Sequence, residues 1–379
     1  MLIVFSTVLL YGALPTTRDP ALLNSTLFRT FEVEHTFWDG NQISTIHGNH
    51  GDNVSYHITG NSGLEWPKGS GKAVVFQSGI WIAAGKIKPH GESEWQSDPE
   101  DIRTAAAEYT VEFVPGPIDT TYEDGHIYEI HRVEVDAFLN NNYATFSQMK
   151  TEIPVTIGTS RQTIEVTFPT DDFINWPAHL GAPYVDANND RLYNIADGDY
   201  PDILGDQFHW YVMNDADASV HIPLWGTEPM NLEIQTSLFG FNQSGALGDT
   251  WFLRYVMIND GNDDLDSVFV SMWHDDDVGQ ADDDLVACDT TLSLGFTYND
   301  ADGDGQFGVE APATGSDFFQ GPVVESEGDQ AVLLKWNRLE SYHLDTLENY
   351  RQLPMTSFVK YINGDPDFVD PNTAQEAYN

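Results

Sequence analysis

Residues 251–273 read WFLRYVMINDGNDDLDSVFVSMW, and this stretch decides the fold class. Two runs rich in β-branched and aromatic residues, Trp251 to Ile258 and Val268 to Trp273, flank the polar segment 259–264. Apolar runs of this length, separated by Asn, Asp and Gly, are typical of strands joined by a turn. The stretch therefore predicts strand, turn, strand.

Strand signals of the same kind recur along the chain at the spacing of β-sandwich proteins. We expect further strands within residues 28–38, 73–85, 108–114, 127–135, 153–168, 208–213, 232–241 and 292–298. A weak helical period occurs only at 330–351. The fold is therefore expected to be mainly β, with antiparallel β-sandwich-like domains and long Asp- and Gly-rich calcium-binding loops.

The length of 379 residues gives room for two or three domains. We expect a signal peptide at 1–15, an N-terminal β domain at 16–168, a second β domain with acidic loops at 169–330, and the start of a truncated further segment at 331–379.

The apolar segment at residues 2–14 is too short for a membrane helix and resembles the apolar part of a secretory signal. A basic segment does not precede it, so the alternatives are a start further upstream or no signal at all. With a signal, the protein is secreted or held at the outer cell surface. The single cysteine, Cys288, cannot form an internal disulfide and is expected to be a small buried apolar side chain.

The charge is strongly acidic, at −44 from 16 basic and 60 acidic residues. Such a field repels nucleic acid and anionic membranes, and we exclude both as partners. Salt adaptation and the binding of divalent ions both explain the acidity. The clustering of Asp residues favours ions.

The most regular acidic cluster begins at Asp186. It has oxygen-bearing side chains at loop positions 1, 3, 5, 9 and 12 and a backbone carbonyl at position 7, as in calcium loops. These residues are Asp186, Asn188, Asp190, Leu192, Asn194 and Asp197, and Asp199, Asp202 and Asp206 are close enough in sequence to complete the shell. Arg191 replaces the usual glycine at position 6, and Asp197 replaces the usual Glu at position 12. The alternative is a polar turn without an ion.

Two further acidic segments are candidate calcium loops. The first follows a strand and contributes Asp275, Asp277, Asp282 and Asp284, with Asp289 nearby; the second contributes Asp300, Asp302 and Asp304. Alternating carboxylates can converge on calcium, but a solvated charged loop has the same composition. Calcium is the one cofactor that we expect.

Signals for catalysis are weak. The chain has neither His-Glu-x-x-His nor a Gly-x-Ser-x-Gly elbow, and the segment at 69–72 lacks the spacing of a phosphate loop. His47 and His50 lie in an expected loop without a nearby pair to complete a zinc site. His209, His221 and His274 lie near acidic segments, where a structural role is the commoner one. Carboxylate pairs such as Glu108 with Glu112 occur by chance in so acidic a chain.

Several strings together resemble one family. They are Phe37-Trp38-Asp39-Gly40, Glu65-Trp66-Pro67-Lys68-Gly69-Ser70-Gly71-Lys72, Ser78-Gly79-Ile80-Trp81-Ile82, Val114-Pro115-Gly116-Pro117, residues 198–207 and Asp317-Phe318-Phe319-Gln320-Gly321-Pro322. The chain thereby resembles large secreted proteins of Bacteroidetes and related marine bacteria that are cargo of the type IX secretion system. The resemblance implies export, a β-rich N-terminal region, variable modules and a C-terminal sorting domain. This chain ends at Asn379 without such a domain, so we expect an N-terminal fragment.

Two functions are compatible with these features. The first is a secreted or cell-surface calcium-binding protein with a structural or adhesive role and no catalytic activity. The second is a carbohydrate-binding or polysaccharide-degrading protein with an acidic, aromatic cleft, for which Trp176, Trp210, Trp225 and Trp273 are candidate stacking platforms. Exposed tryptophans along one sheet face would favour the second function, and tryptophans buried between sheets would favour the first.

Overall fold

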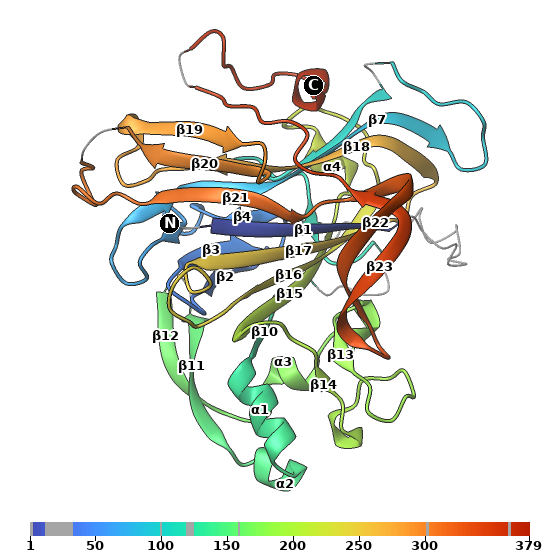
Figure 1. The fold of residues 1–379 in the computed structure, drawn as a ribbon. Helices are drawn as coiled ribbons and strands as arrows, with labels where there is room; N and C mark the ends of the chain where they lie inside the picture. Colours follow the sequence, from blue (N-terminus) through green and yellow to red (C-terminus); the bar gives the residue numbers. More distant parts are fainter. Residues whose placement is uncertain are drawn as a thin grey trace.

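The computed structural model of the chain describes residues 3–11, 33–98, 101–118, 125–157, 160–300, 303–362 and 365–379. Its fold is mainly β, as the sequence predicts, with a few short helices and irregular segments between the strands (Figure 1). Among the described residues, no helix combines the length and the apolar character needed to cross a bilayer.

The largest sheet contains nine strands of the described part of the chain. In spatial order they are β10 (Tyr128–His131), β15 (Gln207–Asn214), β16 (Leu232–Gly240), β17 (Thr250–Asn259), β1 (Ile3–Tyr11), β21 (Ala313–Gln320), β20 (Leu294–Asn299) and β19 (Asp284–Asp289), with β9 (Val114–Pro115) beside β15. Neighbours are antiparallel except at β1, which pairs in parallel with both β17 and β21. The largest sheet is therefore mixed at its centre.

Among the described residues, five smaller groups of strands and five α-helices surround this sheet. A four-stranded sheet contains β18 (Asp263–Asp275), β7 (Gln77–Pro89), β4 (Asp52–Val54) and β8 (Arg103–Ala106), and another contains β2 (His35–Trp38), β3 (Ser44–Gly48), β5 (Leu64–Glu65) and β6 (Ala73–Val75). Two-stranded pairs are β11 (Lys150–Ile157) with β12 (Ser160–Thr167), β13 (Tyr184–Val185) with β14 (Tyr200–Pro201), and β22 (Val323–Asn337) with β23 (Ser341–Gln352). The helices are α1 (Arg132–Asn140), α2 (Tyr143–Phe146), α3 (Asp171–Ile174), α4 (Ala218–His221) and α5 (Ala374–Tyr378).

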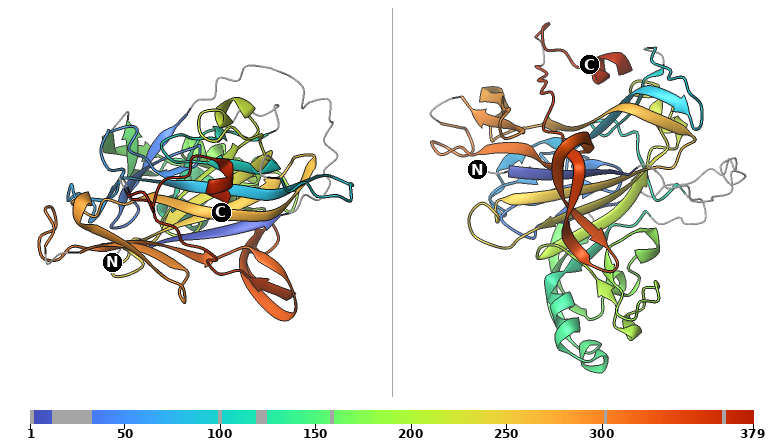
Figure 2. Two further views of the ribbon diagram at one scale, coloured as in Figure 1. Left: turned by 90° about the horizontal axis from the view of Figure 1, so that it is seen from above. Right: turned by 45° about the vertical axis from the view of Figure 1, so that its right-hand side comes forward.

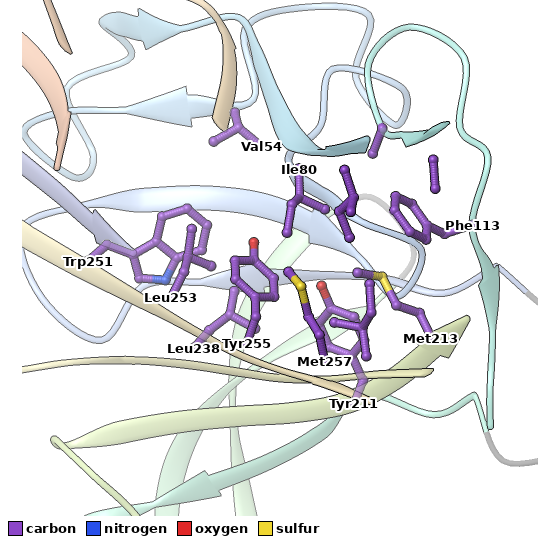
Figure 3. Close-up of a cluster of buried hydrophobic side chains, with 14 of the residues drawn as sticks. Val54, Ile80, Phe113, Tyr211, Met213, Leu238, Trp251, Leu253, Tyr255 and Met257 are labelled. Atoms are coloured by element: carbon purple, nitrogen blue, oxygen red, sulfur yellow. The ribbon is translucent and has the colours of Figure 1, made fainter. Parts of the chain in front are cut away.

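The turn at residues 259–264 carries the chain from one sheet to another. β17 before it pairs with β16 and β1, whereas β18 after it pairs with β7. Alternate side chains of β17 point toward the second sheet and form the main core, which Figure 3 shows in close-up. Trp251, Leu253, Tyr255 and Met257 are each at most 1% exposed and belong to the same cluster as Ile80 of β7. The predicted sandwich-like packing follows from this alternation.

A second core covers the opposite face of β15. Phe208, Trp210 and Val212 belong to a cluster that includes Val135 of α1 and Phe173 of α3. Figure 1 shows these helices below the sheet, beside the β11–β12 hairpin. Because both faces of β15 are covered, every residue of the strand is buried.

Most predicted strands are present within the described residues, but three segments differ; residues 28–32 of the strand predicted at 28–38 lie outside the described residues. Residues 132–140 form α1 instead of continuing the strand β10, and only the end of 108–114 is in a strand. Residues 330–351 form most of the β22–β23 hairpin and not a helix, with Ala331 and Leu333 buried at period two. Cys288 is exposed on β19, so the prediction that it is buried is wrong.

The sheets cross the domain boundaries that the sequence indicates. β10 pairs with β15 and β7 pairs with β18, so strands from before and after residue 168 share sheets. The β22–β23 hairpin likewise spans residue 331. Ile3–Tyr11, the centre of the predicted signal segment, forms β1; residues 1, 2 and 12–15 of that segment lie outside the described residues. The views in Figure 2 show β1 within the layer of the large sheet.

Candidate metal sites

The loop at residues 186–199 makes the tight turn that calcium-loop spacing requires, although glycine is missing from its sixth position. Asn189 and Arg191 take left-handed backbone angles, with φ of 62° and 72°. Gly198 closes the loop with φ of 102°. Arg191 therefore adopts the conformation for which glycine is the usual residue.

The first residue of this loop, Asp186, is paired with protein groups. Its Oδ1 accepts a hydrogen bond from the backbone of Asp190 at 3.2 Å, and its Oδ2 accepts one from Arg191 at 2.9 Å. The guanidinium of Arg338 donates to the same Oδ2 at 2.5 Å. Burial alone would raise the pKa of Asp186, but the hydrogen bonds from Arg191 and Arg338 outweigh it and lower that pKa. A cation from the protein already compensates this carboxylate.

The other predicted ligands of the loop bond mainly within it. Asn188 donates to Asp190, whose other oxygen accepts from the backbone of Leu192. Asn194 donates to Asp197 at 2.6 Å, and the buried Asp199 accepts from the backbone of Ala187 and Asn194, each at 2.8 Å. These bonds are those of an Asx-turn loop, which was the alternative to an ion.

Two carboxylates expected to complete the shell have other partners. Asp202 accepts hydrogen bonds from Trp336 and Ser341 of the β22–β23 hairpin. Asp206 accepts from the backbone of Asn242. These bonds tie the loop region to its neighbours.

The second and third predicted loops lie together. The backbone amide of Asp300 donates to the carbonyl of Asp283, and the carboxylate of Asp304 accepts from the backbone of Gln280. We refer to residues 275–284 with Asp300 and Asp304 as the acidic cluster. Asp302 lies outside the described residues. Asp304 also accepts from Gln306 and Phe307, and these bonds outweigh burial and lower its pKa.

Three carboxylate oxygens of the acidic cluster are buried without a hydrogen-bond partner. They are the Oδ1 atoms of Asp276, Asp283 and Asp284. The second oxygen of Asp276 accepts from Thr297 at 2.6 Å, and that of Asp284 accepts from the backbone of Val278 at 2.8 Å. Each unpartnered oxygen has therefore lost water without gaining a protein donor, which is unfavourable.

The charges of the acidic cluster raise one another's pKa. Burial, with the charges of Asp275 and Asp276, raises the pKa of Asp277 to about 6. Burial, with the charges of Asp283, Asp276 and Asp277, raises the pKa of Asp284 to about 7. The imidazole Nδ1 of His274 lies 3.6 Å from Asp276 Oδ1. Asp275 accepts a hydrogen bond from the hydroxyl of Tyr109, and Asp282 accepts one from the side chain of Gln280.

Another group of potential ligands joins His35, His50 and Asp52, which we call the His–Asp site. Among the described residues it is the one group of three or more His, Cys, Asp or Glu whose ligand atoms all lie within 4.8 Å of one another. Sequence reasoning missed it. The expectation that His47 and His50 lie in a loop without further ligands nearby is wrong: His47 lies in β3, and the residues that meet His50 are His35 of β2 and Asp52 of β4.

His47 belongs to a buried chain of polar groups that sequence reasoning also missed. Its Nε2 lies 2.8 Å from Nδ1 of His209, whose Nε2 lies 2.9 Å from the amide of Gln207. Gln207 donates to Glu129, and His131 lies 2.9 Å from the same carboxylate. Burial and the neighbouring His209 lower the pKa of His47 to about 3. The ring is therefore neutral at ordinary pH.

The remaining candidate residues from the sequence, one histidine and four tryptophans, are either fully buried or half-buried. His221 is buried against the carbonyl of Asp215 at 2.9 Å. Trp176 and Trp210 are 2% and 1% exposed and pack in the second core. Trp225 and Trp273 are half-buried around Trp81, with Trp273 stacked at 6.5 Å between ring centroids.

Comparisons with family models, with curated proteins and with solved structures find no match for this chain.

Proposed function

We propose that this is a secreted or cell-surface calcium-binding protein in which calcium at the acidic cluster stabilises a structural or adhesive β scaffold. The observation that carries the proposal is the set of three buried carboxylate oxygens without a donor, on Asp276, Asp283 and Asp284. Carboxylate oxygens are preferred ligands of calcium. An ion bound to one or two of these carboxylates would supply a missing partner for charges that otherwise repel one another.

The sequence around these oxygens leaves few other ways to balance the charge. Residues 275–304 contain neither Lys nor Arg. Two unit charges 4 Å apart repel by about 4 kcal/mol at an effective dielectric of about 20. A divalent cation would remove this repulsion, and the raised pKa values of Asp277 and Asp284 fit a site built for one.

Export is part of the same proposal: the resemblance to type IX secretion cargo implies a protein outside the cell, and this supports the choice of calcium. At free calcium about 100 times the dissociation constant, one site adds roughly 2.7 kcal/mol to the free energy of unfolding. The loop at 186–199 remains a second proposed calcium site, with fewer free oxygens. Calcium would thus stabilise the fold without taking part in a reaction.

Thermal unfolding tests the proposal. The full chain is unfolded in millimolar calcium, in chelator at matched ionic strength, and in magnesium. We expect a calcium-specific rise in melting temperature of about 10 °C for two sites. An equal effect of calcium and sodium at the same ionic strength would overturn the proposal.

One surface feature favours the second function, binding of extracellular polysaccharide. Trp225 and Trp273 pack on Trp81, and the 48%-exposed Tyr109 packs on Trp273; rings in such a group can stack on sugars. Beside them, burial and the charge of Asp370 raise the pKa of Glu108 to about 7. Titration with polysaccharides while tryptophan fluorescence is followed tests this function, and a Trp273→Ala variant that binds as well as the unchanged chain would contradict it.

A further inference from the structure

We propose that the His–Asp site binds a zinc-type transition metal ion, separately from any calcium. Its three side chains offer two imidazole nitrogens and one carboxylate. Imidazole suits zinc, copper, iron and nickel, whereas calcium prefers oxygen ligands alone. This site therefore differs in chemistry from the acidic cluster and does not depend on the proposed function.

The distances between ligand atoms fit such an ion. His35 Nε2 lies 3.1 Å from Asp52 Oδ2, and His50 Nε2 lies 3.6 Å from Asp52 Oδ1. A tetrahedral ion with bonds of about 2.0–2.1 Å has ligand atoms about 3.3 Å apart. The two imidazole rings are nearly perpendicular, with centroids 5.3 Å apart, so they approach the carboxylate from different directions.

The carboxylate of Asp52 has an unused acceptor facing this space. Its side chain is 0% exposed, yet Oδ1 has no hydrogen-bond partner. The 3.6 Å to His50 Nε2 is too long for a hydrogen bond. A metal between the two atoms would satisfy the buried oxygen, which is costly to leave alone.

The backbone keeps this space open. Gly48 lies opposite His35 in the β2–β3 ladder. A Cβ atom at Gly48 would lie 2.2 Å from Asp52 Oδ1 and 3.0 Å from the ring of His50. Gly51, with φ of 101°, makes the turn that sets His50 beside Asp52. Glycine at position 48 thus leaves room at the ligand atoms, and glycine at position 51 permits the turn.

Access from solvent and a free coordination position are both compatible with this geometry. The side chains of His35 and His50 are 14% and 9% exposed, so the site lies just below the surface. Three protein ligands plus one water is a common zinc arrangement. A bound ion would also link β2 to the turn before β4.

Metal titration tests the proposal on the full chain in millimolar calcium, which fills any calcium site first. We expect one zinc ion or one cobalt ion per chain, the cobalt giving the visible absorption of tetrahedral coordination. Because loss of even an indirect ligand contact costs about 10- to 100-fold in affinity, His35→Gln and His50→Gln should each weaken binding by about 100-fold or more.

The control variant is His90→Gln, since the ring of His90 is 82% exposed and lies outside the His–Asp site. It should bind zinc like the unchanged chain. Circular dichroism checks the fold of each variant, and the partly exposed His35 is the safer position if His50→Gln misfolds.

Two results would overturn the proposal: no stoichiometric zinc or cobalt binding by the unchanged chain, or equal affinity in folded His35→Gln. Either would leave His35 and Asp52 as a hydrogen-bonded pair. Neither result bears on the calcium response, which is measured separately with zinc absent.

Discussion

The loop at 186–199 and the acidic cluster contrast in how their charges are compensated. The loop has the more regular calcium spacing, yet Asp186 is held by two backbone amides and by Arg338. The acidic cluster has the less regular spacing, yet it contains three buried oxygens without a donor. Regular spacing in the sequence thus indicates a turn, whereas the need for an ion depends on which charges the fold leaves unpaired.

The largest expected effect is on the calcium-dependent rise in melting temperature, and it distinguishes the acidic cluster from the loop at 186–199. Asp276→Asn combined with Asp284→Asn should remove most of the calcium-dependent rise in melting temperature, which we put at about 10 °C for two sites. In chelator, this variant should melt no lower than the unchanged chain, because losing two charges relieves repulsion. Thermal unfolding with and without calcium measures both.

The matched variant for this experiment is Asp186→Asn with Asp190→Asn in the other loop. It should keep the larger part of the calcium response but melt lower in chelator, since the ion pair with Arg338 is lost. If this variant loses the calcium response and the other keeps it, the roles of the two regions are reversed.

Two glycines provide a second, smaller contrast. Gly279 and Gly198 both have left-handed angles, with φ of 77° and 102°. An added Cβ would lie 2.2 Å from Asp304 Oδ1 at Gly279, but 3.3 Å from the nearest atom, on Ala187, at Gly198. Gly198→Ala should cost about 1–2 kcal/mol from backbone strain. Gly279→Ala should cost more and also reduce the calcium response.

Chemical denaturation at fixed calcium measures this pair of variants. Equal losses of stability and equal calcium responses would show that the contact between Gly279 and Asp304 has no special role.

Arg338→Met tests whether a protein cation occupies the place of an ion at Asp186. Without calcium the variant should melt lower, because the buried Asp186 loses its guanidinium partner. Its gain from calcium should exceed that of the unchanged chain, since Oδ2 of Asp186 becomes available. Arg351→Met is the control, because Arg351 is exposed on β23. A calcium gain that stays the same would contradict this role of Arg338.

Local pattern was enough to predict most strands, because burial on one or both faces leaves a direct trace in the sequence. β15, β16 and β17 are the clearest cases. The local pattern gave the wrong prediction at α1, where apolar and polar residues continue to alternate after β10. It was also wrong at residues 330–351, because a short apolar run is compatible with helix and strand equally. Tertiary packing decided those segments.

The candidate sites divide in the same way. The turn at 186–199 could be predicted from its spacing, whereas the pairing of Asp186 with Arg338 joins residues 152 positions apart. The acidic cluster combines two loops that sequence analysis treated separately. In the His–Asp site, His50 and Asp52 are close in sequence, but His35 lies beside them only because β2 pairs with β3 in the observed register. Spacing within one segment contains no signal for these contacts.

The smallest expected effect concerns another protein cation between carboxylates, His126. Its ring lies 2.8 Å from Glu34 and 3.0 Å from Asp172. Hydrogen bonds with Asp172 and Glu34 raise its pKa to about 10. A group whose pKa is raised in the folded state contributes its full stabilisation of the fold below its unfolded pKa, about 6.5 for His. This stabilisation is lost as the pH rises toward the folded pKa of about 10.

Because the side chain of His126 is 44% exposed, solvent screening limits its contribution to about 1 kcal/mol or less. Between pH 7 and pH 10 the unchanged chain should therefore lose slightly more stability than His126→Gln, as urea denaturation at both pH values would measure. Parallel losses in the two proteins would mean that His126 is neutral in the folded state. In that case Glu34 and Asp172 would resemble the acidic cluster, where the chain supplies neither Lys nor Arg.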